Sequence, residues 1–258
     1  MRLCRYAIDG EARFGQLLDG PDEGRVQPLV GDDFESLTPE GASIERAAVR
    51  LLCPVLPSKI VCVGRNYRAH AAELGHAVPE QPLLFLKPPS ALLPTEFTIR
   101  LPSASEKVEH EAELAVVVGA LARNVSPERA LEHVLGYTAF NDVTARDIQK
   151  REVQFTRAKG FDTFAPVGPW IETALDPRGL RIQCRVNGQT RQDGNTAQMV
   201  FDVAALVSYA SRCMTLLPGD VIATGTPEGV GPLAPGDVVE VEIDGLGVLR
   251  NPVAPEAA

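Results

Sequence analysis

The sequence predicts a β-rich protein of the α+β class. Apolar runs with the length and β-branched composition of buried strands recur along the chain, at 59–64, 112–118 and 221–224. Two dipeptides favoured in two-residue hairpin turns, Asp-Gly at 9–10 and Asn-Gly at 187–188, close other strand-like runs. The segments with helical spacing are short and lie between these strands.

Length, composition and charge limit the classes of protein to consider. The 258 residues suffice for one large domain, or for one domain with a small appendage, and 45% hydrophobic with 23% charged residues is ordinary for a globular protein. A net charge of −9 argues against nucleic acid as a partner, because phosphate binding needs a basic surface. A small anionic substrate remains compatible, since a metal ion or a few arginines can reverse the field locally.

The sequence carries no signal of secretion or of a membrane span. Residues 1–5 lack an apolar signal core, and no apolar stretch has the length that a bilayer requires. The five cysteines, an odd number without a C-x-x-C pair, fit reduced thiols. We therefore expect a cytoplasmic protein that binds neither nucleic acid nor a membrane.

We expect the chain to divide into two parts. Residues 1–55 form a small β-rich module, in which the strands 3–8 and 13–18 flank the Asp-Gly turn. Its expected role is to cover or orient the rest. Pro54 and Pro57 mark its end, so residues 56–258 form the larger domain that carries the chemistry.

The stretch from 108 to 118 carries the most distinctive pattern. Side chains alternate between the faces of a strand, so Glu111 and Glu113 point the same way. Two neighbouring carboxylates beside an apolar strand repel each other, unless one takes up a proton or a cation lies between them. Mg²⁺ is the natural cation here because it prefers oxygen ligands. An exposed strand end with solvated glutamates is the alternative interpretation.

A short helix is predicted next to the strand 59–64. Asn66 is its expected N-cap and Gly75 its expected stop, so His70 and Glu73 are neighbours on one helix face. A carboxylate beside an imidazole raises its basicity and fixes its tautomer, as a general base requires. A simple surface pair is the alternative.

Further polar residues stand where strands end. Asp142 lies at the junction of a strand and a helix, and Arg146 and Gln149 are one turn apart on that helix. Lys159, which precedes a glycine and two aromatic residues, suits a partly buried cationic site or a plain loop. Lys87, at the end of another apolar strand, is expected to face solvent.

The turn that follows the strand 221–224 is rich in glycine. The backbone N–H groups around Gly225 and the hydroxyl of Thr226 could hold a carboxylate there. The turn lacks the lysine and the spacing of a P-loop, so nucleotide binding is not expected. Residues 192–196 are expected to form a polar loop.

Five segments, in the same order along the chain, resemble the motifs of the fumarylacetoacetate hydrolase superfamily. Together they span about 59–253, and they are Val63-Gly64-Arg65-Asn66-Tyr67 with His70 and Glu73, then 110–114, 141–147, 159–163 and 225–231. The module at 1–55 is similar to the small domain of bacterial members that act as 2-hydroxyhepta-2,4-diene-1,7-dioate isomerases or decarboxylases.

The resemblance implies a mixed β-sandwich roll with short helices, assembled as a homodimer. It assigns a Mg²⁺ or Mn²⁺ ion to Glu111, Glu113 and Asp142, and it places His70 and Glu73 on a lid helix that closes over substrate. By the same resemblance the substrate site is lined by a further set of polar residues, namely Lys159, Arg146, Gln149 and Thr226.

The resemblance also implies a class of reaction, and it leaves three functions open. The substrate is a small 2-oxo, 2,4-dioxo or 2-hydroxy-dienoic acid, whose reaction passes through an enolate that a divalent cation stabilises. Hydrolysis of a C–C bond, as in an acylpyruvase, or decarboxylation is the first function. The second is isomerisation or decarboxylation of hydroxy-dienedioates in aromatic catabolism. The third is a metal-binding structural protein without activity.

Overall fold

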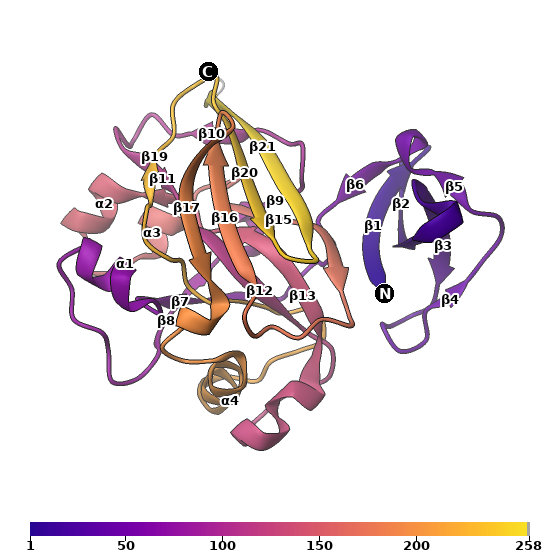
Figure 1. Ribbon diagram of the computed structural model, residues 1–258, viewed down its shortest axis with the longest axis horizontal. Helices are drawn as coiled ribbons and strands as arrows, with labels where there is room; N and C mark the ends of the chain where they lie inside the picture. The colour runs from indigo at the N-terminus through magenta and orange to yellow at the C-terminus, as the bar shows by residue number, and fades with distance from the viewer. Residues whose placement is uncertain (257–258) are drawn as a thin grey trace.

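A long mixed sheet runs through the whole computed structural model, which describes residues 1–256 (Figure 1). Its strands are β1 (Arg2–Ile8), β2 (Glu11–Leu17), β3 (Arg25–Val30), β4 (Thr38–Pro39), β5 (Ile44–Glu45), β6 (Arg50–Leu52), β7 (Ile60–Gly64), β8 (Leu83–Lys87), β9 (Leu92–Leu93), β12 (Ala112–Val118), β13 (Val134–Asn141), β15 (Ala165–Glu172) and β18 (Val221–Ala223). The main path runs in the order β4-β3-β2-β1-β15-β13-β12-β18-β7-β8, and β5, β6 and β9 pair beside it. In this sheet the N-terminal strands lie at one end, and β12 and β13, in or next to which the acidic residues lie, are in the interior of the other half.

A second layer packs on the middle of this sheet. It is a sheet of order β10-β21-β20-β16-β17, formed by β10 (Ile99–Leu101), β16 (Arg181–Val186), β17 (Gln189–Asn195), β20 (Val238–Ile243) and β21 (Gly247–Pro255). Ile182 and Val241 from this layer share one apolar core with Leu114 and Val116 of β12. A smaller sheet joins β14 (Thr144–Ala145), β11 (Val108–His110) and β19 (Gly231–Pro232). The predicted β-sandwich roll with short helices is confirmed.

The helices are short and lie at the ends of the sheets. Three of them, α1 (Arg68–Glu73), α2 (Arg146–Arg151) and α3 (Thr156–Lys159), lie on the side away from the N-terminal strands (Figure 1). The longer α4 (Val203–Cys213) begins at Asp202, whose Oδ1 accepts a hydrogen bond of 2.8 Å from the Ala205 N–H, as expected of an N-cap. Single 3₁₀ turns occur at 20–22, 46–48, 89–91 and 196–198, and a longer 3₁₀ segment at 127–133. Among residues 1–256, no helix has the length and apolar character needed to cross a membrane.

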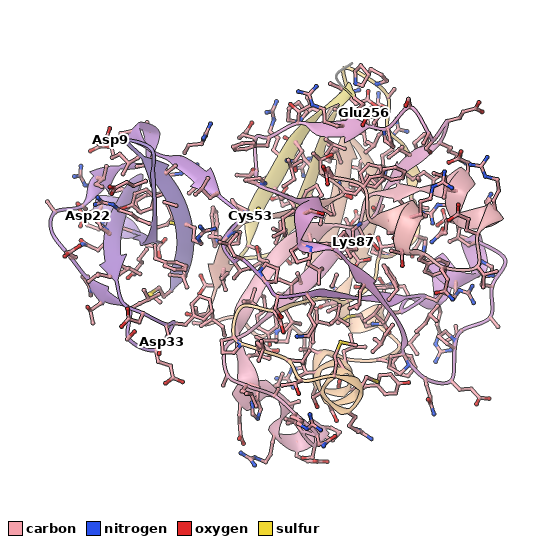
Figure 2. The ribbon with its side chains drawn as sticks, turned by 180° about the vertical axis from the view of Figure 1, so that it is seen from behind. Asp9, Asp22, Asp33, Cys53, Lys87 and Glu256 are labelled. Carbon is pink, nitrogen blue, oxygen red and sulfur yellow. The ribbon has the colours of Figure 1, made fainter. Side chains whose placement is uncertain are left out.

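The N-terminal strands form a lobe with a small core of its own. Cys4, Tyr6 and Val26 are buried together inside it. The lobe joins the rest through β1, which pairs antiparallel with β15, so that Arg2 lies opposite Glu172. Figure 2 shows the lobe from behind, with Asp9, Asp22 and Asp33 on it and Lys87 in the larger body. The division of the chain at residue 55 stays a prediction.

Two local predictions are wrong. Asn66 does not cap α1, which begins at Arg68. The Asn66 side chain is instead buried and bonded to backbone groups distant in sequence: Nδ2 donates to Thr224 O at 2.8 Å and to Phe201 O at 3.0 Å. Residues 192–195 are not a loop but the end of β17, which the Asn-Gly turn at 187–188 folds back along β16. Pairing with β16 therefore outweighs the low strand propensity of these polar residues.

Candidate active site

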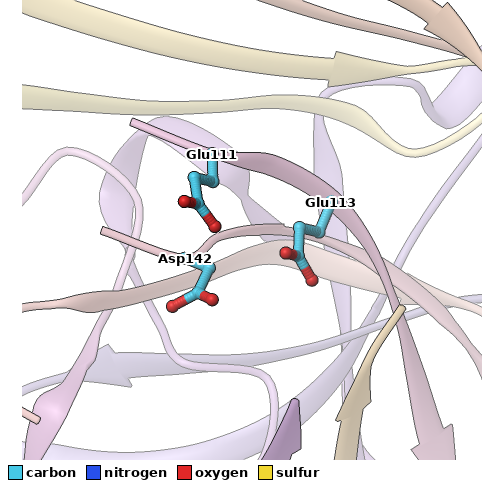
Figure 3. A group of neighbouring side chains, drawn as sticks. All are labelled: Glu111, Glu113 and Asp142. Atoms are coloured by element: carbon cyan, nitrogen blue, oxygen red, sulfur yellow. The ribbon is translucent and has the colours of Figure 1, made fainter. Parts of the chain in front are cut away.

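Strand pairing brings the three acidic residues together. Glu111 and Glu113 come from the β11–β12 stretch, and Asp142 directly follows β13. Ala112 lies opposite Asn141 in the antiparallel pair, and the Asp142 N–H donates to Glu111 O at 2.9 Å. Figure 3 shows the three carboxylates converging. One oxygen from each lies within 4.8 Å of the others, and all three side chains are buried.

Lys159 and Arg146 neutralise part of this charge. The Lys159 ammonium donates to Glu111 Oε2 at 3.0 Å, to Asp142 Oδ2 at 2.5 Å and to the Thr144 hydroxyl at 2.8 Å. Arg146 forms ion pairs with Glu111 and with Glu109, the latter at 2.6 Å. Although burial disfavours the ionised form of Glu111, the Lys159 and Arg146 charges outweigh it and lower the pKa of this carboxyl. Glu111 is therefore held as an anion.

Lys87 also belongs to this cluster, and the prediction that it faces solvent is wrong. Its side chain is 1% exposed, and its ammonium donates to Asp142 Oδ1 at 2.5 Å and to Val143 O at 3.0 Å. Strand parity could have placed it correctly, because Lys87 shares a face of β8 with Leu83 and Phe85, which line the cavity, whereas Leu86 is exposed.

Glu113 is the carboxylate that the protein leaves without a cation. Glu113 Oε2 accepts a hydrogen bond of 2.8 Å from the Gly225 N–H, and no ion pair to Glu113 is found among residues 1–256. Burial raises its pKa well above the ordinary value, and the charges of Asp142 and Glu111 raise it further. Three converging, buried carboxylates with one uncompensated charge fit a divalent cation with oxygen ligands.

The acidic cluster forms the floor of a cavity of about 640 Å³. Nine of the predicted site residues line its wall, namely His70, Glu73, Glu111, Glu113, Asp142, Arg146, Gln149, Lys159 and Thr226. Arg146 orients Gln149 by donating a hydrogen bond of 2.6 Å to its Oε1. Apolar residues such as Leu83, Phe85 and Phe155 also line the cavity, so it offers both polar and apolar contacts.

Gly225, the tenth predicted residue, lies behind the cavity wall rather than on it. Its N–H is already bonded to Glu113, so this amide holds a protein carboxylate rather than one from a substrate. A side chain is excluded at this position, because a Cβ would lie 2.8 Å from the Cβ of Asn66 and the backbone φ is +96°.

The histidine–glutamate pair lies at the cavity edge on α1. His70 Nδ1 and Glu73 Oε2 are 3.4 Å apart, with His70 buried. The Gly229 N–H lies 3.1 Å from Glu73 Oε1 and 3.2 Å from Oε2, so Glu73 also connects α1 to the turn at 225–231. The pair can therefore exchange protons with a molecule in the cavity while its carboxylate anchors the helix.

Gln192 is a buried polar residue that the sequence did not single out. Its amide lies between the acidic strand and the turn that carries Thr226, where Nε2 donates to the Thr226 hydroxyl at 2.7 Å. In β17, Gln192 and Gly194 are the buried residues. The composition of this strand, which is polar throughout apart from glycine, shows no matching alternation in the sequence.

Comparisons with known proteins agree with the geometry. The family model described as fumarylacetoacetate (FAA) hydrolase C-terminal matches residues 59–254, and a model described as Rv2993c-like, N-terminal, matches residues 1–54. Oxaloacetate tautomerase fahd2, mitochondrial, from Xenopus laevis is 46% identical, over 81% of this chain and 70% of its own.

Two solved structures cover the chain almost completely. The 5-carboxymethyl-2-hydroxymuconate delta-isomerase from Mycobacterium smegmatis has 46% identity and a TM-score of 0.93, over 99% of this chain and 100% of its own. The maleylpyruvate hydrolase from Sphingobium sp. SYK-6, in complex with manganese(II) and pyruvate, has 32% identity and a TM-score of 0.82, over 100% of both chains. The fold, the acidic cluster and these matches agree, and the chain belongs to the fumarylacetoacetate hydrolase family.

Proposed function

We propose that the protein is a divalent-metal-dependent enzyme that acts on 2-oxo or 2,4-dioxo acids through an enolate, and that it hydrolyses a C–C bond or removes carbon dioxide. The observation that carries the proposal is the set of three buried carboxylates, Glu111, Glu113 and Asp142, at the floor of a cavity that also holds a histidine–glutamate pair. Relatives in the family are isomerases, hydrolases and tautomerases, which supports an enzyme.

Glu111, Glu113 and Asp142 would hold the ion, Mg²⁺ or Mn²⁺, since all three offer oxygen ligands. Bound there, the cation would act as a Lewis acid toward negative charge on the substrate oxygens. Mn²⁺ with pyruvate in the Sphingobium hydrolase supports both the type of ion and the type of ligand. Burial and the neighbouring carboxylates disfavour ionised Glu113 unless a cation lies beside it, which supports a divalent ion at this point.

The basic and polar residues of the wall bind and orient the acid. Burial favours neutral Lys159, but the Asp142 and Glu111 charges outweigh it and raise its pKa, so its ammonium remains charged. It lies beside the acidic cluster, where its positive charge would stabilise an enolate oxygen or a carboxylate, while its three N–H groups donate to Glu111, Asp142 and the Thr144 hydroxyl. Arg146 and Gln149, together with Thr226, provide further hydrogen-bonding groups on the same wall.

His70 is proposed to move the proton. Its Nδ1 faces Glu73, which leaves the imidazole Nε2 to take a proton from a water molecule or from a substrate carbon. Removal of a proton from water gives hydrolysis, and proton transfer between substrate positions gives isomerisation.

Isomerisation or tautomerisation is the second candidate function. It is favoured by the delta-isomerase structure that matches the whole chain and by the tautomerase that is 46% identical. The same side chains serve both functions, because each needs a stabilised enolate and one proton-transfer group. We also propose, from the family resemblance, that the protein is a homodimer. It would bind a small anionic oxo acid and no nucleic acid.

A substrate panel separates these functions. Protein loaded with Mg²⁺ or Mn²⁺ is assayed against acetylpyruvate, oxaloacetate and a 2-hydroxy-dienedioate, with product identified by mass spectrometry. Acid products of C–C cleavage or carbon dioxide support the first function, and a rearranged product of unchanged mass supports the second. Absence of turnover of all three, with metal still bound, contradicts both and indicates a metal-binding protein without activity.

A variant of the proton-transfer residue tests the proposed mechanism independently. His70→Ala should abolish turnover while metal affinity stays within a factor of about two. The His70 ring is hydrogen-bonded to Glu73 and to none of the three carboxylates among the described residues. Metal affinity is measured by isothermal titration calorimetry. Loss of metal binding in this variant would show that the histidine belongs to the metal site instead.

A further inference from the structure

We propose that Gln192 is a positioning residue that fixes the Thr226 hydroxyl as a hydrogen-bond donor toward the cavity, so that this part of the site accepts an anionic oxygen. The inference rests on the proposed function and adds to it the polarity of one wall of the substrate site. Gln192 and Thr226 are 0% and 2% exposed, so the hydrogen bond between them is shielded from bulk water.

The orientation of the Gln192 amide is fixed by two backbone groups. Its Oε1 lies 3.0 Å from the Ala112 N–H, which can only donate. Its Nε2 lies 2.8 Å from Pro227 O, which can only accept. A turned amide would place an NH₂ group against a donor and an oxygen against a carbonyl, leaving two buried groups unsatisfied. The NH₂ group therefore faces Thr226.

His110 contacts the same amide oxygen. Its Nδ1 lies 3.1 Å from the same Gln192 Oε1, so with the amide fixed by the two backbone groups this nitrogen must carry a proton and donate to that oxygen. Its Nε2 has no hydrogen-bond partner among the described residues.

The polarity of Thr226 follows from the amide orientation. Gln192 Nε2 donates to Thr226 Oγ1 at 2.7 Å, so the hydroxyl oxygen is the acceptor in this bond. The hydroxyl proton must point elsewhere, and no acceptor for it is found in the part of the chain that the structure describes. Because Thr226 lines the cavity, that proton is available to a ligand there.

This arrangement favours an acceptor oxygen in the group that binds, and most of all an anionic one. A carboxylate or enolate oxygen accepts the Thr226 proton, whereas an ammonium or amide N–H meets an oxygen with only one of its two lone pairs left and leaves the hydroxyl proton unused. A hydrogen bond to a charged group in a buried site is among the stronger ones. The Gln192 side chain thus acts on the ligand through Thr226, without a contact of its own to the cavity.

The test is a double-mutant cycle read out by pyruvate binding. Pyruvate affinity is measured by calorimetry on Mn²⁺-loaded protein for Gln192→Glu, Thr226→Val and the double variant. The ionised carboxylate of Gln192→Glu still accepts from Ala112 and His110, but it has no proton for Pro227 O and draws the Thr226 proton to itself. We expect about a tenfold loss of pyruvate affinity in the parent background, and no further loss when Thr226 is already Val. Mn²⁺ affinity should be retained in all variants.

Further variants keep the result interpretable. Thr226→Ser retains the hydroxyl and should bind pyruvate nearly as the parent does. If Gln192→Glu fails to fold, Gln192→Met replaces it; this side chain neither donates nor accepts strongly, so we expect a smaller loss that again vanishes in the Thr226→Val background. Equal losses in both backgrounds, or no loss at all, overturn the inference while leaving the proposed function intact. Failure of the parent protein to bind pyruvate with Mn²⁺ present contradicts the proposed function and this inference together.

Discussion

At the scale of single residues, the site is a balance of buried charges. Glu111 is paired with Lys159 and Arg146, and Asp142 with Lys159 and Lys87. Glu113 instead accepts a hydrogen bond from the Gly225 backbone N–H. The protein therefore leaves one buried carboxylate for which the most favourable states are a protonated acid or a metal ligand.

Metal binding should release a proton from Glu113. Its pKa in the folded, metal-free protein lies well above the ordinary 4.5, so between these values the folded state binds a proton that the unfolded chain does not. The Glu113 contribution to stability is fully present below pH 4.5 and is lost as the pH rises through the folded pKa. Over the same range, Mn²⁺ affinity should rise with pH, up to about tenfold per unit.

Calorimetry in buffers of different ionisation enthalpy measures this proton release. We expect about one proton per Mn²⁺ for the parent protein at a pH below the raised pKa. Glu113→Gln carries no proton to release and should bind Mn²⁺ more weakly. Equal release by parent and variant would show that the proton comes from another group.

Lys87 should contribute to stability through its buried ion pair with Asp142. Lys87→Met removes one partner and leaves Asp142 with less compensation, which should lower the free energy of unfolding by about 3 kcal/mol. Denaturant unfolding with a metal chelator present measures the change. Lys107→Met is the matched control, because Lys107 pairs with Glu109 at 3.0 Å while half-exposed, and its loss should change the free energy by less than about 1 kcal/mol. Similar values for both variants would contradict this role of Lys87.

At the scale of elements, the turn after β18 holds the site together. It contributes the Gly225 N–H to Glu113, the Thr226 hydroxyl to the cavity and the Gly229 N–H to the Glu73 carboxylate of α1. The strands β11, β12 and β17 reach this turn through Gln192. The position of the turn thus couples the acidic cluster to the helix that carries His70.

Gly225→Ala should displace this turn. The new methyl group would lie 2.8 Å from the Asn66 Cβ, in addition to the cost of a positive φ. Gly236→Ala is a matched control, since φ there is +93° and a Cβ would meet nothing within 4 Å. We expect a cost of about 1 kcal/mol for the control and of about 3 kcal/mol or more for Gly225→Ala, together with weaker Mn²⁺ binding in the latter alone. Equal unfolding free energies and unchanged metal affinity would show that the turn tolerates the methyl group.

The sequence predicted those parts of the site that depend on local periodicity. Strand parity placed Glu111 and Glu113 on one face, and helix periodicity paired His70 with Glu73. Asp142 joins them through the register of Ala112 opposite Asn141, which no local pattern contains; only the family resemblance indicated it. Lys87 and Gln192 were misjudged because burial of a polar side chain depends on partners far away in the sequence, Asp142 in one case and Thr226 in the other.

At the scale of the whole molecule, the site and the N-terminal lobe lie at opposite ends. The cavity-lining residues begin at Val63, so none comes from the lobe. Figure 1 shows α1 and α2 on the far side from β1–β6. The expected role of this module as a cover for the larger domain therefore does not extend to the cavity of the same chain. The lobe extends the central sheet through β1 and β15 instead.

The central claim is that Glu111, Glu113 and Asp142 jointly hold one catalytic divalent ion. The most direct measurement is a calorimetric titration of metal-free protein with Mn²⁺, combined with oxaloacetate turnover before chelation, after chelation and after the ion is restored. We predict one ion per chain, loss of turnover on chelation and its return with Mn²⁺, with both binding and turnover severely reduced in Glu113→Gln. Full turnover after exhaustive chelation, or unchanged Mn²⁺ binding by Glu113→Gln, would contradict the account.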